Sequence, residues 1–255
     1  ERDLKFVPKD HTIVICGHAQ LFRTFGKKSP DSKNHLSYAR YSKLLAQYDK
    51  VYSWSGHYHY NFGYDYANST SEAHAPLKNI ASICVARTCG GLHCNRDLYN
   101  DGTPNGYAIF TVKDNSVDDF VYKGTDLDES YQMRIYNGSQ KYTGSKKLTF
   151  GWPEEYKGCF IADVFNDDAE NWKVEFIQNG VATPMTRVTK KLRDWCMFAY
   201  FINENGRSPK NTAYHTGKLH YWTLPAPCGD PAKEKNWEIR ATYTVPTSGR
   251  VNVYT

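Results

Sequence analysis

The sequence has no long hydrophobic run and no cluster of basic residues, and these two absences exclude broad classes of protein. No window of about 18 consecutive apolar residues occurs among the 255, so we expect no transmembrane segment. The net charge of +5 comes from basic residues that occur at most in pairs, so nucleic acid, which needs several clustered phosphate contacts, is not indicated as a partner.

A signal-peptide pattern and a zinc-type cysteine motif are also missing. The chain begins at Glu1 rather than methionine, so we expect a processed or trimmed piece from which any targeting segment has been removed. Cys84, Cys89 and Cys94 recur every five residues, whereas zinc sites typically use a two-residue gap. Because the seven cysteines are odd in number, not all can pair within the chain, and we expect buried thiols with room for one bridge.

The first part of the sequence predicts a strand–helix–strand unit. Residues 12–16 (TIVIC) form a continuous apolar run of the kind found in parallel strands that are buried on both faces. Residues 35–48 place apolar side chains at mostly helical spacing after Asn34, a plausible cap, and residues 50–54 (KVYSW) predict a second strand. We expect a right-handed connection that brings the carboxyl ends of both strands to one sheet edge.

Three histidines follow these two strands. His18 comes just after the first strand, and His57 and His59 come just after the second, behind Gly56. Residues two apart in extended backbone point the same way, and imidazole is a ligand for zinc, iron, nickel and copper. The sequence therefore predicts a metal site at this edge, and the alternative is a surface pair in a tyrosine-rich loop. We expect a loop position for His74, with a contribution to the site beside Glu72 as the alternative. The remaining histidines are expected to be structural or solvated: His11, His35, His93, His215 and His220.

From about residue 85 onward the pattern predicts a mostly antiparallel β domain. Aromatic residues make up 15% of the chain, which favours pleated sheets. The turn-rich segments NDGTPNG (100–106), KDNS (113–116) and NG (179–180) separate short apolar or alternating segments. Residues 190–202 fit a helix or a strand equally well. We expect strands within 79–88, 107–112, 117–123, 131–136, 159–165, 172–178, 218–224, 236–245 and 251–255.

Taken together, these segments resemble calcineurin-like metallophosphoesterases. VYSWSGHYH (51–59) resembles their terminal Gly-His-x-His motif, and TIVICGHAQLF (12–22) resembles the motif before it, with Gln20 where proline is common. NDGTPNGYAIF (100–110) followed by YQMRIY, and FIADVFNDDAENWKVEF (160–176) followed by NWEIRAT, resemble a C-terminal domain found in a bacterial subgroup.

This resemblance implies an α+β chain in two parts. Residues 1–84 would be the C-terminal part of the metallophosphoesterase α/β sandwich, and residues 85–255 a β-rich C-terminal domain. It implies a hydrolase of phosphate esters that uses two divalent metal ions, Mn, Fe or Zn, to hold an attacking hydroxide. In the family pattern His18 and His57 bind one ion and His59 binds the other. The bacterial subgroup suggests an envelope or secreted location.

The family's other ligand motifs do not occur here. Asp-x-His, Gly-Asp-x-x-Asp and Gly-Asn-His-Glu or -Asp are absent, so the bridging carboxylate is missing. Two neighbouring divalent cations repel unless anionic ligands offset their charge. We therefore expect this chain alone to be inactive, to lack a working dinuclear centre, and to need the missing N-terminal half as its partner. We also expect residues 1–80 to be incompletely covered or to be covered by a neighbouring molecule.

Two other functions fit the sequence. One is a non-catalytic β module that binds glycans or protein partners through stacked rings, although the composition favours core packing for the same tryptophans. The other, compatible with the enzyme, is a structural clamp in which NDGTPNGY (100–107) contacts the N-terminal region and shapes the mouth of its cleft. The tryptophans concerned are Trp152, Trp172, Trp195, Trp222 and Trp237.

Overall fold

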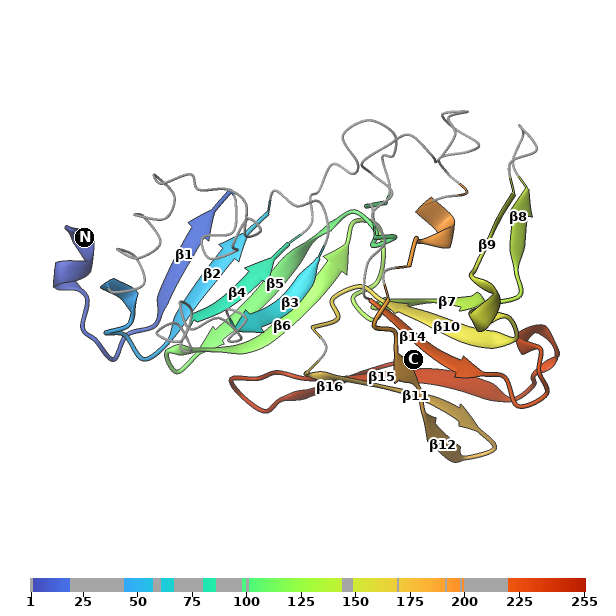
Figure 1. The fold of residues 1–255 in the computed structure, drawn as a ribbon. Helices are drawn as coiled ribbons and strands as arrows, with labels where there is room; N and C mark the ends of the chain where they lie inside the picture. The colour runs from blue at the N-terminus through green and yellow to red at the C-terminus, as the bar shows by residue number, and fades with distance from the viewer. Residues whose placement is uncertain are drawn as a thin grey trace.

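The chain forms two regions of β-sheet joined by a long hairpin (Figure 1). The computed structural model describes residues 2–18, 44–56, 61–66, 80–85, 98–99, 101–143, 149–168, 170–190, 192–197, 199 and 220–255. The strands are β1 (Ile13–Gly17), β2 (Val51–Ser55), β3 (Phe62–Tyr66), β4 (Ile80–Cys84), β5 (Gly106–Lys113), β6 (Ser116–Gly124), β7 (Met133–Asn137), β8 (Lys141–Thr143), β9 (Thr149–Gly151), β10 (Cys159–Val164), β11 (Trp172–Gln178), β12 (Val181–Pro184), β13 (Thr186–Arg187), β14 (Tyr221–Pro225), β15 (Trp237–Thr244) and β16 (Val251–Tyr254). Short 3-10 helices occur at η1 (Asp3–Phe6), η3 (Glu154–Tyr156) and η6 (Pro231–Lys233).

The N-terminal region is a four-stranded sheet in the order β1-β2-β4-β3. β1 pairs in parallel with β2, which pairs in parallel with β4, and β3 runs antiparallel to β4. The two predicted strands are therefore adjacent and parallel. The predicted helix at 35–48 lies mostly outside the described residues, within which Leu44 and Leu45 are helical. The described part does not show the expected α/β sandwich, and none of its helices is long and apolar enough to cross a bilayer.

β1 is the exposed edge of this sheet. Val14 is 39% exposed, and Cys16 and Gly17 are exposed as well. Ile13 is buried, in a small cluster with Leu45, Tyr48 and Val51. The prediction that the TIVIC run is buried on both faces is wrong, because Ile13 is the one buried residue of β1, and within the described ranges β2 is its one paired strand. Its exposure agrees with the expected incomplete cover of the N-terminal residues.

The C-terminal region is a sandwich of two antiparallel sheets, which confirms the predicted β domain. One sheet has the order β13-β14-β10-β7 and the other β12-β11-β15-β16. Their aromatic side chains meet in the core: the Phe160 ring lies 4.9 Å from Phe176 and 4.6 Å from Trp237, measured between centroids. The NG turn joins β11 to β12 as predicted, with positive φ at Asn179 and Gly180.

The β5–β6 hairpin connects the two regions through a ladder of aromatic rings. Trp54 of β2 stacks on Phe110 of β5 at 4.0 Å, and Phe110 stacks on Phe120 of β6 at 4.8 Å. Phe120 in turn meets Tyr243 of β15 edge-on at 6.5 Å. One hydrophobic cluster therefore runs from β2 and β4 into the sandwich. The predicted domain boundary at residues 84–85 stays a prediction.

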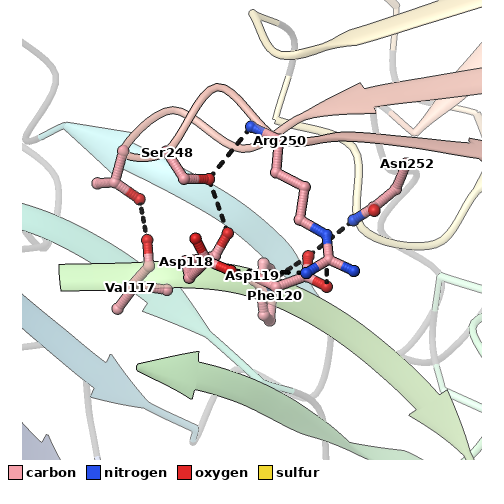
Figure 2. A network of polar contacts seen from close by, with 8 residues as sticks. Val117, Asp118, Asp119, Phe120, Ser248, Arg250 and Asn252 are labelled. Carbon is pink, nitrogen blue, oxygen red and sulfur yellow. Dashed lines mark hydrogen bonds and ion pairs between the residues drawn. The ribbon is translucent and has the colours of Figure 1, made fainter. Parts of the chain in front are cut away.

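Polar contacts fasten the same hairpin to the turn between β15 and β16 (Figure 2). Ser248 Oγ donates to the Asp118 carbonyl at 2.7 Å, and Asn252 Nδ2 donates to Asp119 Oδ1 at 2.7 Å. Arg250 Nε lies 3.4 Å from Asp119 Oδ2 and Nη1 lies 3.5 Å from Asp118 Oδ2. The hairpin is thus held on the sandwich side by hydrogen bonds and ion pairs as well as by apolar packing.

Candidate functional site

The carboxyl ends of β1 and β2 meet at one edge of the N-terminal sheet. Gly17 and Ser55 are paired at the ends of the two strands. His18 follows Gly17, and its carbonyl accepts a hydrogen bond of 3.0 Å from the Gly56 N–H. A Cβ added to Gly56 would lie 3.6 Å from the Val85 carbonyl oxygen and 3.7 Å from that of His18. The residues that follow β1, β2 and β4 therefore come together at the predicted edge.

The two histidines of the Gly-His-x-His motif, His57 and His59, lie outside the described residues. Their convergence with His18 on shared metal ions stays a prediction. The structure does describe where their segment ends. Asn61, the second residue after His59, is buried, and its N–H donates to Asp101 Oδ2 at 3.1 Å.

Asp101 belongs to the turn that the sequence offered as a clamp between the two regions. Its side chain is fully buried, and Oδ1 accepts a hydrogen bond of 3.1 Å from the Thr103 N–H. Oδ2 also lies 3.8 Å from Nδ1 of His220, the residue before β14. The bond from Asn61 confirms that NDGTPNGY (100–107) contacts the N-terminal region. An effect on the mouth of a cleft stays a prediction.

Behind this turn lies a cluster of buried polar side chains from the sandwich. Arg134 of β7 donates from Nη1 to the Gly102 carbonyl at 2.7 Å, and the Tyr136 hydroxyl donates to Asp194 Oδ2 at 2.6 Å. Gly102 has a φ of +86°, and a Cβ added there would lie 2.2 Å from Asp194 Cγ. Both the positive φ and the lack of space for a Cβ require glycine at this position. The turn therefore packs directly against the Asp194 carboxylate.

Asp163 lies at the centre of this cluster without a hydrogen bond. It is fully buried in β10, where Arg134 of β7 and Tyr221 of β14 are its cross-strand partners. Neither carboxylate oxygen has a hydrogen-bond partner among the described residues. Burial raises the pKa of Asp163 well above its ordinary value, the negative charge of Asp194 adds to this, and Arg134 opposes it. Asp163 therefore favours the protonated form, and burial raises the pKa of Asp194 as well.

Two tyrosines complete the wall around Asn61. The Tyr122 hydroxyl donates to the Pro104 carbonyl at 2.6 Å, and Tyr99 N–H donates to the Thr103 carbonyl at 2.8 Å. Burial, together with Tyr99, raises the pKa of Tyr122 far above its ordinary value. The Tyr122 phenol therefore stays neutral and serves as a hydrogen-bonding group rather than as an acid or base.

The described residues do not complete a dinuclear metal centre. Within those ranges no group of three or more histidine, cysteine, aspartate or glutamate side chains is arranged to hold a metal ion. The predicted ligand set of His18, His57 and His59 consists of neutral imidazoles, which do not offset the repulsion between two divalent cations. This donor set fits one part of such a centre and lacks its bridging carboxylate.

The cysteines offer no further site. Cys84 and Cys159 are buried thiols, as expected, whereas Cys16 and Cys228 are exposed. Burial raises the pKa of the Cys159 thiol, which makes it a poorer nucleophile. Among the five cysteines that the structure describes no disulfide is formed. The expectations for Cys89 and Cys94 fall outside the described residues.

The tryptophans serve the core rather than a binding groove. Trp152, Trp172 and Trp222 are buried. Trp195 and Trp237 are half-buried, and each packs against other rings: Trp195 meets Tyr142 at 5.5 Å, and Trp237 lies against the rings of the sandwich core. A glycan-binding module requires an exposed row of such rings, and these five residues do not form one.

Comparison with known families identifies the C-terminal region. Residues 88–246 match a family model described as the C terminal of Calcineurin-like phosphoesterase, and this span is more than half of the chain. The chain belongs to this family. The calcineurin-like phosphoesterase C-terminal domain thus includes Asp101, the β5–β6 hairpin and most of the sandwich. No curated protein and no solved structure matches the chain.

Sequence reasoning did not find the partners that this domain contributes to the site edge. No sequence pattern indicated a role for Asn61 or Arg134. His220 was expected to be structural or solvated, and its burial supports the structural role. Two weak signals were present: an aspartate within the turn-rich NDGTPNG, and a charged residue, Asp163, inside the otherwise apolar run CFIADVF.

Proposed function

We propose that this chain is the C-terminal portion of a metal-dependent phosphoesterase that hydrolyses phosphate esters with two divalent ions, Mn, Fe or Zn. In this proposal His18 and His57 bind one ion and His59 binds the other. The observation that carries it is the family match at residues 88–246, beside a parallel strand pair that puts His18 next to Gly56. Bound ions of this kind supply a hydroxide nucleophile and stabilise negative charge.

The proposal includes an N-terminal half that completes both the site and the α/β sandwich. The bridging carboxylate and the remaining ligands come from that half, so the chain alone is inactive. The exposed β1 edge supports this arrangement, because Val14 and Cys16 offer a strand edge and an apolar surface for further layers of the sandwich.

Hydrolysis of p-nitrophenyl phosphate and of its bis ester, with added Mn²⁺ or Zn²⁺, tests the function. We expect turnover by the full-length protein and little by this chain. In the full-length protein His57→Ala lowers kcat/KM by at least about a hundredfold, whereas His11→Ala, at an exposed histidine away from the edge, leaves it unchanged. If the full-length protein has no activity either as the wild type or as the His57→Ala variant, the proposed enzymatic function is wrong.

The resemblance to a bacterial subgroup also leads us to propose an envelope or secreted location. Fractionation of the native cell tests this by immunoblotting. Recovery in the envelope or the medium supports the proposal, and recovery in the cytosol alone contradicts it.

A further inference from the structure

The segment that carries the Gly-His-x-His histidines is held at both ends by backbone N–H groups. At its start the Gly56 N–H donates to the His18 carbonyl at 3.0 Å. At its end the Asn61 N–H donates to Asp101 Oδ2 at 3.1 Å. These two bonds fix the described residues on either side of positions 57–60. The first anchor belongs to the N-terminal sheet and the second to the C-terminal domain.

The second anchor is itself fixed by the sandwich. Asp101 Oδ1 accepts from the Thr103 N–H at 3.1 Å, which sets the orientation of the carboxylate. The next residue, Gly102, accepts from Arg134 at 2.7 Å and packs against the Asp194 side chain. Asp101 therefore keeps its place relative to the sheet that contains β7 and β10.

We propose that Asp101 is a positioning residue for the metal site, which holds Asn61 and thereby sets where His59, two residues earlier, is presented. The role of His59 rests on the proposed function, whereas the contact with Asn61 does not. The C-terminal domain thus has a definite task in the enzyme. It fixes the end of the last metal-binding segment without contributing a metal ligand.

The chemistry of position 101 makes this role testable in steps. Asn61 is 1% exposed, so its N–H cannot turn to solvent when the acceptor is removed. Asp101→Ala removes the acceptor for both N–H groups, and Asp101→Asn leaves one oxygen for the two. We expect the segment to loosen in that order, with alanine the more severe.

Hydrogen exchange in the full 255-residue chain measures this loosening directly. In Asp101→Ala the Asn61 amide should exchange about ten- to hundredfold faster than in the wild type, and in Asp101→Asn by a smaller factor. The imidazole resonances of His57 and His59 should shift in both variants. Amides in the sandwich core, such as those of Ile161 and Val174, should keep their wild-type rates.

Asp119 supplies a matched control, because it is also a buried carboxylate that accepts one local and one distant hydrogen bond (Figure 2). Asp119→Ala should leave the exchange of Asn61 and the resonances of both histidines unchanged. In the full-length enzyme Asp101→Asn should weaken Mn²⁺ binding about tenfold, measured by calorimetry, and Asp119→Ala should not.

Unchanged exchange at Asn61 in both Asp101 variants would overturn the proposal, and so would an equal acceleration in Asp119→Ala. If Asp101→Ala unfolds the whole chain, the Asp101→Asn result decides. Exchange rates do not depend on catalysis. A full-length protein without phosphoesterase activity would therefore defeat the proposed function and leave the anchoring of the segment by Asp101 standing.

Discussion

β1 and β10 are both short, mostly apolar strands, yet they differ in how far their residues are buried. All six residues of β10 are buried, whereas in β1 Ile13 alone is buried and Val14 is 39% exposed. β10 lies between β14 and β7 and is covered by the second sheet, whose Phe176 packs on Phe160. Among the strands that the structure describes, β1 pairs with β2 alone.

The contrast shows that burial is decided by neighbours rather than by the composition of a strand. The sandwich supplies its own second layer, so its apolar strands are buried within one region. The N-terminal sheet obtains cover for β2 and β4 from the β5–β6 hairpin, which belongs to the C-terminal domain. The N-terminal region therefore depends on the C-terminal domain, and the following changes test how far that dependence goes.

Phe120→Ala should have the largest effect, because this ring joins the two regions. Phe120 is 2% exposed and contacts both Phe110 and Tyr243. We expect a loss of about 3–5 kcal/mol in the free energy of unfolding, measured by urea titration. Val112→Ala, at an exposed residue of the same hairpin, should cost less than about 0.5 kcal/mol. Equal costs for the two variants would mean that the hairpin does not carry the core between the regions.

Gly102→Ala should be next, because it displaces the turn that bears Asp101. The new Cβ meets the Asp194 carboxylate and the backbone has positive φ, so we expect a loss of about 2–4 kcal/mol by chemical denaturation. Gly229→Ala isolates the backbone contribution, since Gly229 has a φ of +79° and no atom within 4 Å of an added Cβ. It should cost about 1 kcal/mol. A Gly102 variant no worse than the control would show that the turn is not seated on Asp194.

The elements that the sequence predicted are those with a local signal. Alternation and turn residues located the hairpins, and Asn115 and Asn179 indeed adopt positive φ in the turns. The strands that the sequence did not predict have little such signal. β8, β9 and β13 have only two or three residues each, and β3 (FGYDY) alternates over five residues but has no aliphatic side chain. The ambiguous segment 190–202 is helical at 195–197 and 199.

The partners of the site edge could not be predicted, because they are set by tertiary contacts. Asn61 and Asp101 are 40 residues apart, and neither residue type indicates the other. The burial of Asp163 depends on cross-strand neighbours from β7 and β14, and the order of strands in the sheet could not be predicted from the sequence. By contrast, the approach of His18 to the residue before His57 followed from the rule that parallel strands end at the same sheet edge.

Asp163→Asn tests how much a buried carboxyl group without a hydrogen bond lowers the stability of the sandwich. The raised pKa means that folded Asp163 keeps its proton above about pH 3.9, where the unfolded chain releases it. The folded state then binds more protons, so this group makes stability fall as pH rises from about 4. The variant lacks that fall, and its melting temperature should exceed that of the wild type by a margin that grows between pH 5 and pH 8.

Asp128→Asn is a control for the same melting-temperature measurements, because its effect on stability should change with pH in the opposite direction. Hydrogen bonds from Ser130 lower the pKa of the exposed Asp128 carboxylate, so it contributes stability above its unfolded pKa and loses that contribution as pH falls. The variant should therefore be slightly less stable than the wild type at pH 7 and equal to it at low pH. A melting-temperature gap for Asp163→Asn that is constant with pH would show that Asp163 is ionised in the fold.

Val14→Ala should have the smallest effect on stability, and it tests directly whether β1 is exposed. Val51, on the neighbouring β2, is 1% exposed, so Val51→Ala should cost about 2 kcal/mol, whereas Val14→Ala should cost less than about 0.5 kcal/mol. Both are measured by urea titration of this chain. If the two costs are equal, β1 is covered in solution and the contrast with β10 disappears. If the proposed N-terminal half covers β1, the Val14→Ala cost in the longer protein should rise toward that of Val51→Ala.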